Sequence, residues 1–201
     1  MISHKPFSQA CENNKDPILA VIAPAFASAR TVLEIGSGTG QHAVHFGAAL
    51  PHLVWQTGDV EDNHPGICAW LKEAALPNVR SPLRLDVDGR EWLALRADGV
   101  FSANTAHIMS WEQVVNMIAG VGVVLLPGGA FCLYGPFNYG GRYTSASNAQ
   151  FDQWLKARDP RSGIRDFEAV NELASLAGLD LQADHAMPAN NRTLVWRKRV
   201  S

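Results

Sequence analysis

The chain has 201 residues, of which 47% are hydrophobic and 18% charged, and its formal net charge is −2. This length favours a single domain, and the composition excludes a disordered or linker-like protein. There is no strongly basic field to collect nucleic acid without sequence preference. No apolar run resembles a secretory signal or is long enough to span a bilayer, so we expect a cytoplasmic protein that does not bind membranes.

The cysteines and histidines indicate neither a disulfide framework nor a metal site. Cys11, Cys68 and Cys132 lie far apart and form no CxxC pair, so a disulfide framework is not expected. His42 and His45 are one helical turn apart, but no further ligands occur at zinc spacing. We therefore expect no metal site.

From residue 29 onward, short apolar runs alternate with longer mixed segments. Strands are predicted at 31–35, 53–57, 78–85, 98–103, 130–134, 179–185 and 193–197. Helices are predicted at 41–50, 65–76, 111–121, 148–157 and 166–176, with another from about residue 17. This alternation indicates βαβ units and a parallel sheet with helices on both faces.

Some features fall outside that alternation. Pro82 interrupts the third strand, which favours a sheet edge. The last two strands have no helix between them, which predicts an antiparallel hairpin at the other edge. Segments 6–27 and 137–147 do not fit the pattern, and either could cover a pocket. The second segment contains Gly140 and Gly141, which suit a lid.

The turn after the first strand is rich in glycine. Gly36 suits a tight turn, Gly38 allows a ligand to approach the backbone, and Gly40 allows close packing of the next helix. The spacing matches neither the dinucleotide fingerprint nor the phosphate loop. Glu34 would oppose a pyrophosphate and favour a cation. The expected ligand is therefore nucleoside-like, cationic and free of phosphate, a description that S-adenosylmethionine meets.

Asp59 follows the second strand about 20 residues after this loop, where an acid can hold ribose hydroxyls. Glu61 and Asp62 are close alternatives for that role.

The segment from Val32 to Gly40 resembles the glycine loop of class I S-adenosylmethionine-dependent methyltransferases. The turn from Leu125 to Gly129 is similar to that family's Leu-Lys-Pro-Gly-Gly turn. The resemblance implies a single-domain, Rossmann-like α/β fold with a seven-stranded, mostly parallel sheet and a C-terminal antiparallel hairpin. The cofactor would be S-adenosylmethionine and the product S-adenosylhomocysteine.

The resemblance also implies roles for individual residues. Asp86 would receive the adenine amino group, and the backbone at Val87 would contact the ring. The residues expected around the amino-acid part of the cofactor are Glu34, Gly36, Ser37, Gly38, Thr39 and Gly40.

A closer resemblance covers nearly the whole chain. The segments 38–43, 104–107, 134–137, 147–152, 158–166 and 187–191 are similar to the methyltransferase-like protein twenty-six family, in which no substrate is firmly assigned. It implies one methyltransferase domain over 1–201. Within it we expect an N-terminal helical cap over 1–28 and a core over 29–201 with an insertion at 136–165.

The reacting groups are expected beyond the fourth strand. Asn104 could contact the cofactor and orient the acceptor, and His107 could act as a base. The alternative interpretation of His107 is a loop residue that packs against the cofactor or caps the next helix. Tyr134, Phe137, Asn190 and Asn191 are predicted on the substrate side, although the asparagine pair also suits a hairpin turn. Arg158 with Asp159, and Arg165 with Asp166, suggest ion pairs.

The hypothesis is methyl transfer from S-adenosylmethionine to a small-molecule or peptidic acceptor. An alternative is a non-catalytic module that binds or senses the cofactor and acts through a protein partner. A nicotinamide-dependent oxidoreductase is disfavoured, because Gln41 stands where the later glycine should be.

Overall fold

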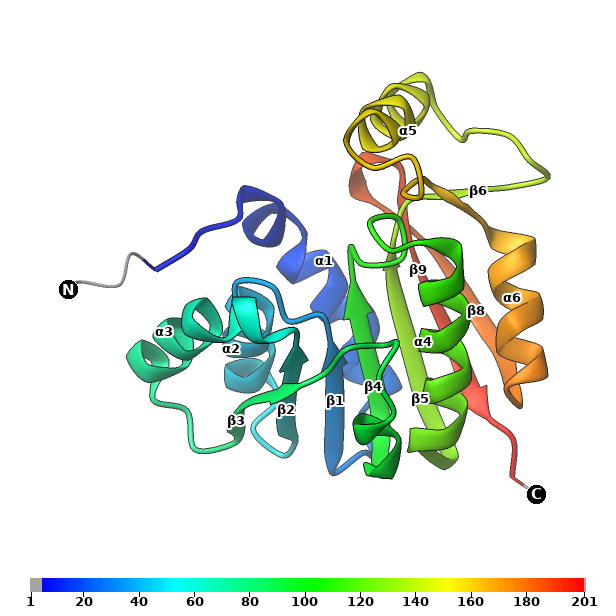
Figure 1. Ribbon diagram of the computed structural model, residues 1–201. Helices are drawn as coiled ribbons and strands as arrows, with labels where there is room; N and C mark the ends of the chain where they lie inside the picture. The colour runs from blue at the N-terminus through cyan, green and yellow to red at the C-terminus, as the bar shows by residue number, and fades with distance from the viewer. Residues whose placement is uncertain (1–4, 201) are drawn as a thin grey trace.

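A computed structural model describes residues 5–200 of the chain. Its centre is a seven-stranded sheet with the order β3-β2-β1-β4-β5-β9-β8 (Figure 1). The first five of these strands are parallel, and β9 runs antiparallel to both β5 and β8. The predicted α/β class, parallel sheet and antiparallel C-terminal pair are confirmed.

The strands of this sheet are β1 (Thr31–Ile35), β2 (Val54–Asp59), β3 (Val79–Arg84), β4 (Ala97–Ala103), β5 (Leu125–Gly135), β8 (Leu179–Met187) and β9 (Asn191–Lys198). The helices are α1 (Gln9–Ala25), α2 (Gln41–Ala49), α3 (His64–Ala74), α4 (Trp111–Val124), α5 (Ala146–Arg158) and α6 (Phe167–Leu176). Short 3-10 turns are η1 (Glu61–Asn63), η2 (Glu91–Ala94) and η3 (Pro188–Asn190). As Pro82 predicts, β3 lies at an edge.

The sheet separates two apolar clusters because strand side chains alternate between its faces. On β1, Leu33 and Ile35 pack with residues of α4 and α6. Val32 points the other way and packs with residues of α1 and α2. The helices thus cover both faces of the sheet. The carboxyl ends of β1, β2 and β4 lie close together where the strands end (Figure 1).

The N-terminal helix begins earlier than its sequence predicts. It starts at Gln9 rather than near residue 17, and the Ser8 hydroxyl caps it by accepting from the Cys11 N–H. Its first half lacks a clear apolar period. The polar residues there bind α2 instead, where Gln41 donates to Glu12 at 2.9 Å. Contacts between helices therefore determine where this helix begins.

The segment between β5 and α6 leaves the main sheet. It consists of β6 (Phe137–Asn138), α5 and β7 (Arg165–Asp166), and β6 pairs in parallel with β7. In Figure 1 this excursion places α5 above the carboxyl ends of the central strands. None of the helices in residues 5–200 combines the length and apolar character of a membrane span.

Candidate active site

A cavity of about 660 Å³ opens at the carboxyl ends of the parallel strands. Open α/β sheets bind ligands at this edge, near the point where strand order reverses. Here the reversal lies between β1 and β4. The glycine loop, the loops after β2, β3 and β4, the start of α1 and one face of α5 all contribute to the lining.

The glycine loop is held by hydrogen bonds to β2 on one side and is open to the cavity on the other. The N–H groups of Gly36 and Ser37 both donate to the Gly58 carbonyl, at 2.9 and 3.1 Å. A Cβ added at Gly36 would lie 2.5 Å from the Thr105 side chain, whereas one added at Gly38 would meet no atom within 4 Å. Gly36, Ser37, Gly38 and Thr39 all line the cavity. The backbone at Gly38 therefore leaves room for a ligand to approach.

Gly40 serves a different purpose. It is the N-cap residue of α2 with a φ of 90°, and a Cβ there would lie 3.1 Å from the Ile67 backbone. It does not belong to the cavity lining. Its role here is to let α2 pack against α3.

Glu34 is placed below the loop and not beside the cavity. It shares the face of β1 used by Val32, so it is buried under α2 with 1% of its surface exposed. Its carboxyl accepts from the Ser37 hydroxyl at 2.8 Å and the Trp55 indole at 3.1 Å. Burial raises the pKa of Glu34 to about 7. The expected position of Glu34 against the ligand is therefore corrected to one that supports Ser37.

Asp59 is the acid that reaches the cavity after β2. Its carboxylate accepts from the Gly38 N–H at 2.6 Å, the Val60 N–H at 2.8 Å and the Asn63 amide at 2.9 Å. The alternatives Glu61 and Asp62 are exposed and lie outside the lining. Asp59 thus connects the glycine loop to β2 and still borders the ligand space.

The loop after β3 supplies Asp86 and Val87 to the lining. Asp86 accepts from the Asp88 N–H at 3.0 Å, which shapes the turn. The Leu85 N–H donates to the Asp59 carbonyl at 2.9 Å. The loops after β2 and β3 are therefore joined beside the cavity.

Asn104 and His107 line the cavity beyond β4. Asn104 has a φ of 59°, a left-handed conformation that asparagine tolerates, and its N–H donates to the Tyr134 carbonyl at 2.9 Å. Burial, together with the nearby positive charge of Arg165, lowers the pKa of His107 to about 4. The imidazole is therefore neutral near pH 7.

The loop that carries His107 is held by the segment before α6. Four successive carbonyls, from Ala106 to Met109, each accept a hydrogen bond from it. Arg165 donates to the first and last, the Gly163 N–H to the carbonyl of His107 at 2.9 Å, and the Ser162 hydroxyl to that of Ile108 at 2.9 Å. Arg165 therefore bonds to backbone carbonyls and not to Asp166, contrary to the predicted ion pair.

The residues predicted on the substrate side lie elsewhere. Phe137 is 1% exposed and packs in the core beside α4 and α6. Tyr134 packs toward α1, and burial raises the pKa of its hydroxyl. The Asn190 carbonyl accepts from Asn148 at 3.1 Å. None of the four lines the cavity, because β5 and the β8–β9 turn direct them into the core or toward neighbouring elements.

The wall opposite the glycine loop comes from α5, which the sequence analysis did not assign to the site. Phe151, Trp154, Leu155 and Arg158 line the cavity. Their spacing of i, i+3, i+4 and i+7 places them on one helix face, a signal present in the sequence. Arg158 does not pair with Asp159, which instead binds Arg161 at 2.9 Å.

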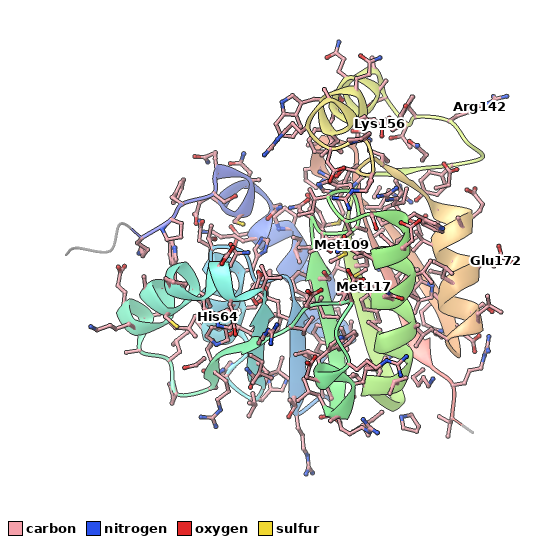
Figure 2. All side chains as sticks on the ribbon, in the orientation of Figure 1. His64, Met109, Met117, Arg142, Lys156 and Glu172 are labelled. Carbon is pink, nitrogen blue, oxygen red and sulfur yellow. The ribbon has the colours of Figure 1, made fainter. Side chains whose placement is uncertain are left out.

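The two candidate covering segments differ. Ser8, Ala10 and Cys11 from the N-terminal segment line the cavity, whereas residues 137–147 do not. Gly140 and Gly141 form a turn closed by the pairing of Tyr139 with Arg142. Figure 2 shows Arg142 at the outer side of this turn, pointing away from the rest of the molecule.

The neighbouring histidines bind protein groups. His42 contacts the Asn14 side chain at 2.7 Å, and His45 contacts Asp16 at 3.0 Å. No group of three or more metal-ligating side chains occurs in residues 5–200.

Comparison with known families assigns the chain to one of them. The model of the family described as "Protein of unknown function (DUF938)" matches residues 5–198. The chain belongs to this family. Membership covers both the glycine loop and α5, so the whole cavity lies within the family's extent.

Solved structures show the fold class. An O-methyltransferase family protein from Burkholderia thailandensis has a TM-score of 0.85 at 18% identity, covering 96% of this chain and 58% of that one. Human N-acetylserotonin methyltransferase, in complex with S-adenosylmethionine, has a TM-score of 0.77 at 15% identity, covering 96% and 53%. The mitomycin 7-O-methyltransferase MmcR has a TM-score of 0.75 at 18% identity, covering 94% and 57%. The chain therefore has the Rossmann-like methyltransferase fold and spans little more than half the length of each of these proteins.

Proposed function

We propose that this protein transfers a methyl group from S-adenosylmethionine to a small-molecule or peptidic acceptor. The observation that carries the proposal is a single cavity bordered by Gly38, Asp59, Asp86, Val87 and His107. It joins an open glycine loop, acids after two successive strands and a possible proton acceptor. A cavity of about 660 Å³ is within the usual size range for small-ligand sites.

The described residues fit this cofactor. The loop from Gly36 to Thr39 would hold its amino-acid part, since Gly38 leaves open space there. Asp59 would receive a ribose hydroxyl, because a carboxylate has about four acceptor positions and this one uses three for the protein. Asp86 and Val87 would border the adenine.

When bound, the cofactor supplies a methyl group on a positively charged sulfur, which is already activated toward nucleophiles. The protein then has to orient the acceptor and stabilise changing charge. Asn104 would orient the acceptor through its side-chain amide. His107, neutral near pH 7, would take a proton from an acceptor that must lose one.

We also propose membership of the methyltransferase-like protein twenty-six family and a cytoplasmic location. The first is supported by motifs spread along the chain, including Asn104 to His107. The second is supported by the cysteines, since Cys11, Cys68 and Cys132 are all free, which fits a reducing compartment.

Calorimetric titration with S-adenosylhomocysteine tests the proposed function. We expect wild type to bind and Asp59→Asn to bind about tenfold more weakly, because one charge-assisted hydrogen bond to a diol is worth about 1.5 kcal/mol. Asp62→Asn is the matched control, since Asp62 is exposed and outside the lining, and it should bind as wild type does.

Absence of binding to the folded wild-type protein would contradict the proposal. A labelled methyl donor then separates enzyme from sensor. Methyl transfer that depends on His107 supports the enzyme. Tight binding with no transfer to any metabolite or peptide tested supports the non-catalytic alternative.

A further inference from the structure

One wall of the cavity is a row of flat side chains that begins beside the proposed proton acceptor. The rings of His107 and Phe151 meet edge to face, with centroids 5.3 Å apart and planes at 70°. Phe151 stacks with Trp154, with centroids 5.8 Å apart and planes at 17°. The Arg158 guanidinium carbon lies 4.6 Å from the Trp154 centroid. We call His107, Phe151, Trp154 and Arg158, which all line the cavity, the aromatic row.

The aromatic row is only partly covered by the protein itself. Trp154 is 50% exposed, and Ile108, which also lines the cavity, is 57% exposed. Large apolar side chains gathered at a cavity mouth mark a binding surface more often than a core. Met109, visible near the upper ends of the central strands in Figure 2, continues this apolar wall. A ligand that covers the row would bury this surface.

Charge is distributed unevenly around the cavity. Asp59 and Asp86 lie at or just after the ends of β2 and β3, in one half of the sheet. The helix α5, which carries Arg158, lies over the half that contains β5 and β9 (Figure 1). Within residues 5–200 no carboxylate lies within 4.0 Å of the Arg158 guanidinium, because Asp159 binds Arg161. An arginine in this state recognises planar anions such as carboxylates through paired hydrogen bonds.

We propose that the acceptor is a small planar aromatic anion, with its ring against Phe151 and Trp154 and its anionic group on Arg158. This inference rests on the proposed function and names the substrate class of the same site. The aromatic row places a hydroxyl of such a ligand toward His107. The new bond joins the hydroxyl oxygen to the methyl carbon, the carbon–sulfur bond breaks with its electron pair left on sulfur, and His107 takes the hydroxyl proton.

Four probes separate the contributions of ring and charge. 3,4-Dihydroxybenzoate carries both, 3,4-dihydroxybenzamide lacks the charge, cyclohexanecarboxylate lacks the aromatic ring, and tyramine reverses the charge. Each is titrated by calorimetry into the full chain saturated with S-adenosylhomocysteine. We expect the acid to bind, and each of the other probes to bind about tenfold more weakly, the loss expected for one charge-assisted hydrogen bond or one stacked ring.

Variants assign these preferences to residues. Arg158→Gln should remove the preference for the acid over the amide, and Trp154→Leu should weaken both about equally. Arg142→Gln is the matched control, an exposed arginine outside the cavity that should keep the preference.

Several outcomes would overturn the inference. Equal binding of the acid and the amide would do so, as would tighter binding of tyramine, or a preference that survives Arg158→Gln. Failure of every aromatic probe to bind a protein that does bind S-adenosylhomocysteine overturns the inference and leaves the proposed function standing. Failure of S-adenosylhomocysteine itself to bind overturns the proposed function, and the inference with it.

Discussion

At the scale of single residues, the buried carboxyl of Glu34 links the stability of the glycine loop to pH. The side chain is 1% exposed and its pKa is raised to about 7 by burial. In the unfolded chain its pKa is near 4.5. Between these values the unfolded state loses the proton while the folded state keeps it, so ionisation disfavours folding as pH rises.

We expect the free energy of unfolding to fall between pH 4.5 and pH 7 by up to about 3 kcal/mol through Glu34 alone, since each pKa unit corresponds to about 1.4 kcal/mol. Glu34→Gln should remove this component, because its amide oxygen can still accept from Ser37 and Trp55. Urea denaturation of both proteins at pH 5 and pH 7.5 measures it. An identical pH dependence in the two would contradict the prediction. As the pH falls below 6.5, the buried His42 and His107, whose pKa values are lowered to about 4, reduce the free energy of unfolding of both proteins, because the unfolded chain binds these protons more readily.

At the scale of elements, the segment that follows α5 holds the loop that carries His107. Arg165 donates to the carbonyls of Ala106 and Met109 and is about half-buried. A lysine keeps the charge but has no planar fork, so it cannot make both contacts in the same geometry. Arg165 is therefore a positioning residue for His107.

Arg165→Lys should lower kcat about tenfold, a loss typical of small displacements of a reacting group, while the Kd for S-adenosylhomocysteine stays the same. The position and pKa of the His107 imidazole, followed by NMR, should change as well, which a purely structural loss elsewhere would not produce. Arg161→Lys is the control, because within residues 5–200 the exposed Arg161 side chain hydrogen-bonds to Asp159 and to no group of the loop that carries His107. A kcat unchanged in Arg165→Lys would remove the positioning role.

At the scale of the whole molecule, the N-terminal segment does more than cover the cavity. Ile18, Ile22 and Phe26 of this segment are fully buried and complete the apolar cluster on one face of the sheet. The same segment supplies Ser8 and Cys11 to the cavity lining. Packing of α1 and formation of the site are therefore coupled.

Ile22→Ala should destabilise the protein by about 2–5 kcal/mol, because it leaves a cavity in a closely packed cluster. Leu176→Ala, at a position that is 80% exposed on α6, should change stability by less than about 0.5 kcal/mol. Thermal or urea unfolding compares the two variants. Similar losses in both would show that α1 is not part of the cooperative core.

The sequence by itself determined the sheet and the position of the loops at its carboxyl ends. Apolar runs of strand length and their order along the chain reflect local periodicity. Gly38, Asp59 and Asp86 lie at or just after strand ends, so their place beside the cavity follows from the order of the strands. The orientation of Glu34 could not be predicted in this way. Both faces of β1 are buried, so its apolar pattern does not show toward which face Glu34 points.

Only the tertiary structure decided which residues form the cavity wall contributed by α5. Phe151, Trp154 and Arg158 lie about 50 residues from His107 in sequence. They line the same cavity, with Phe151 in contact with His107, because the excursion between β5 and α6 folds back over the strand ends. Conversely, Tyr134 and Phe137, which the sequence predicts on the substrate side, pack in the two apolar clusters. Contacts between distant segments depend on which surfaces pack together, and local periodicity does not carry that information.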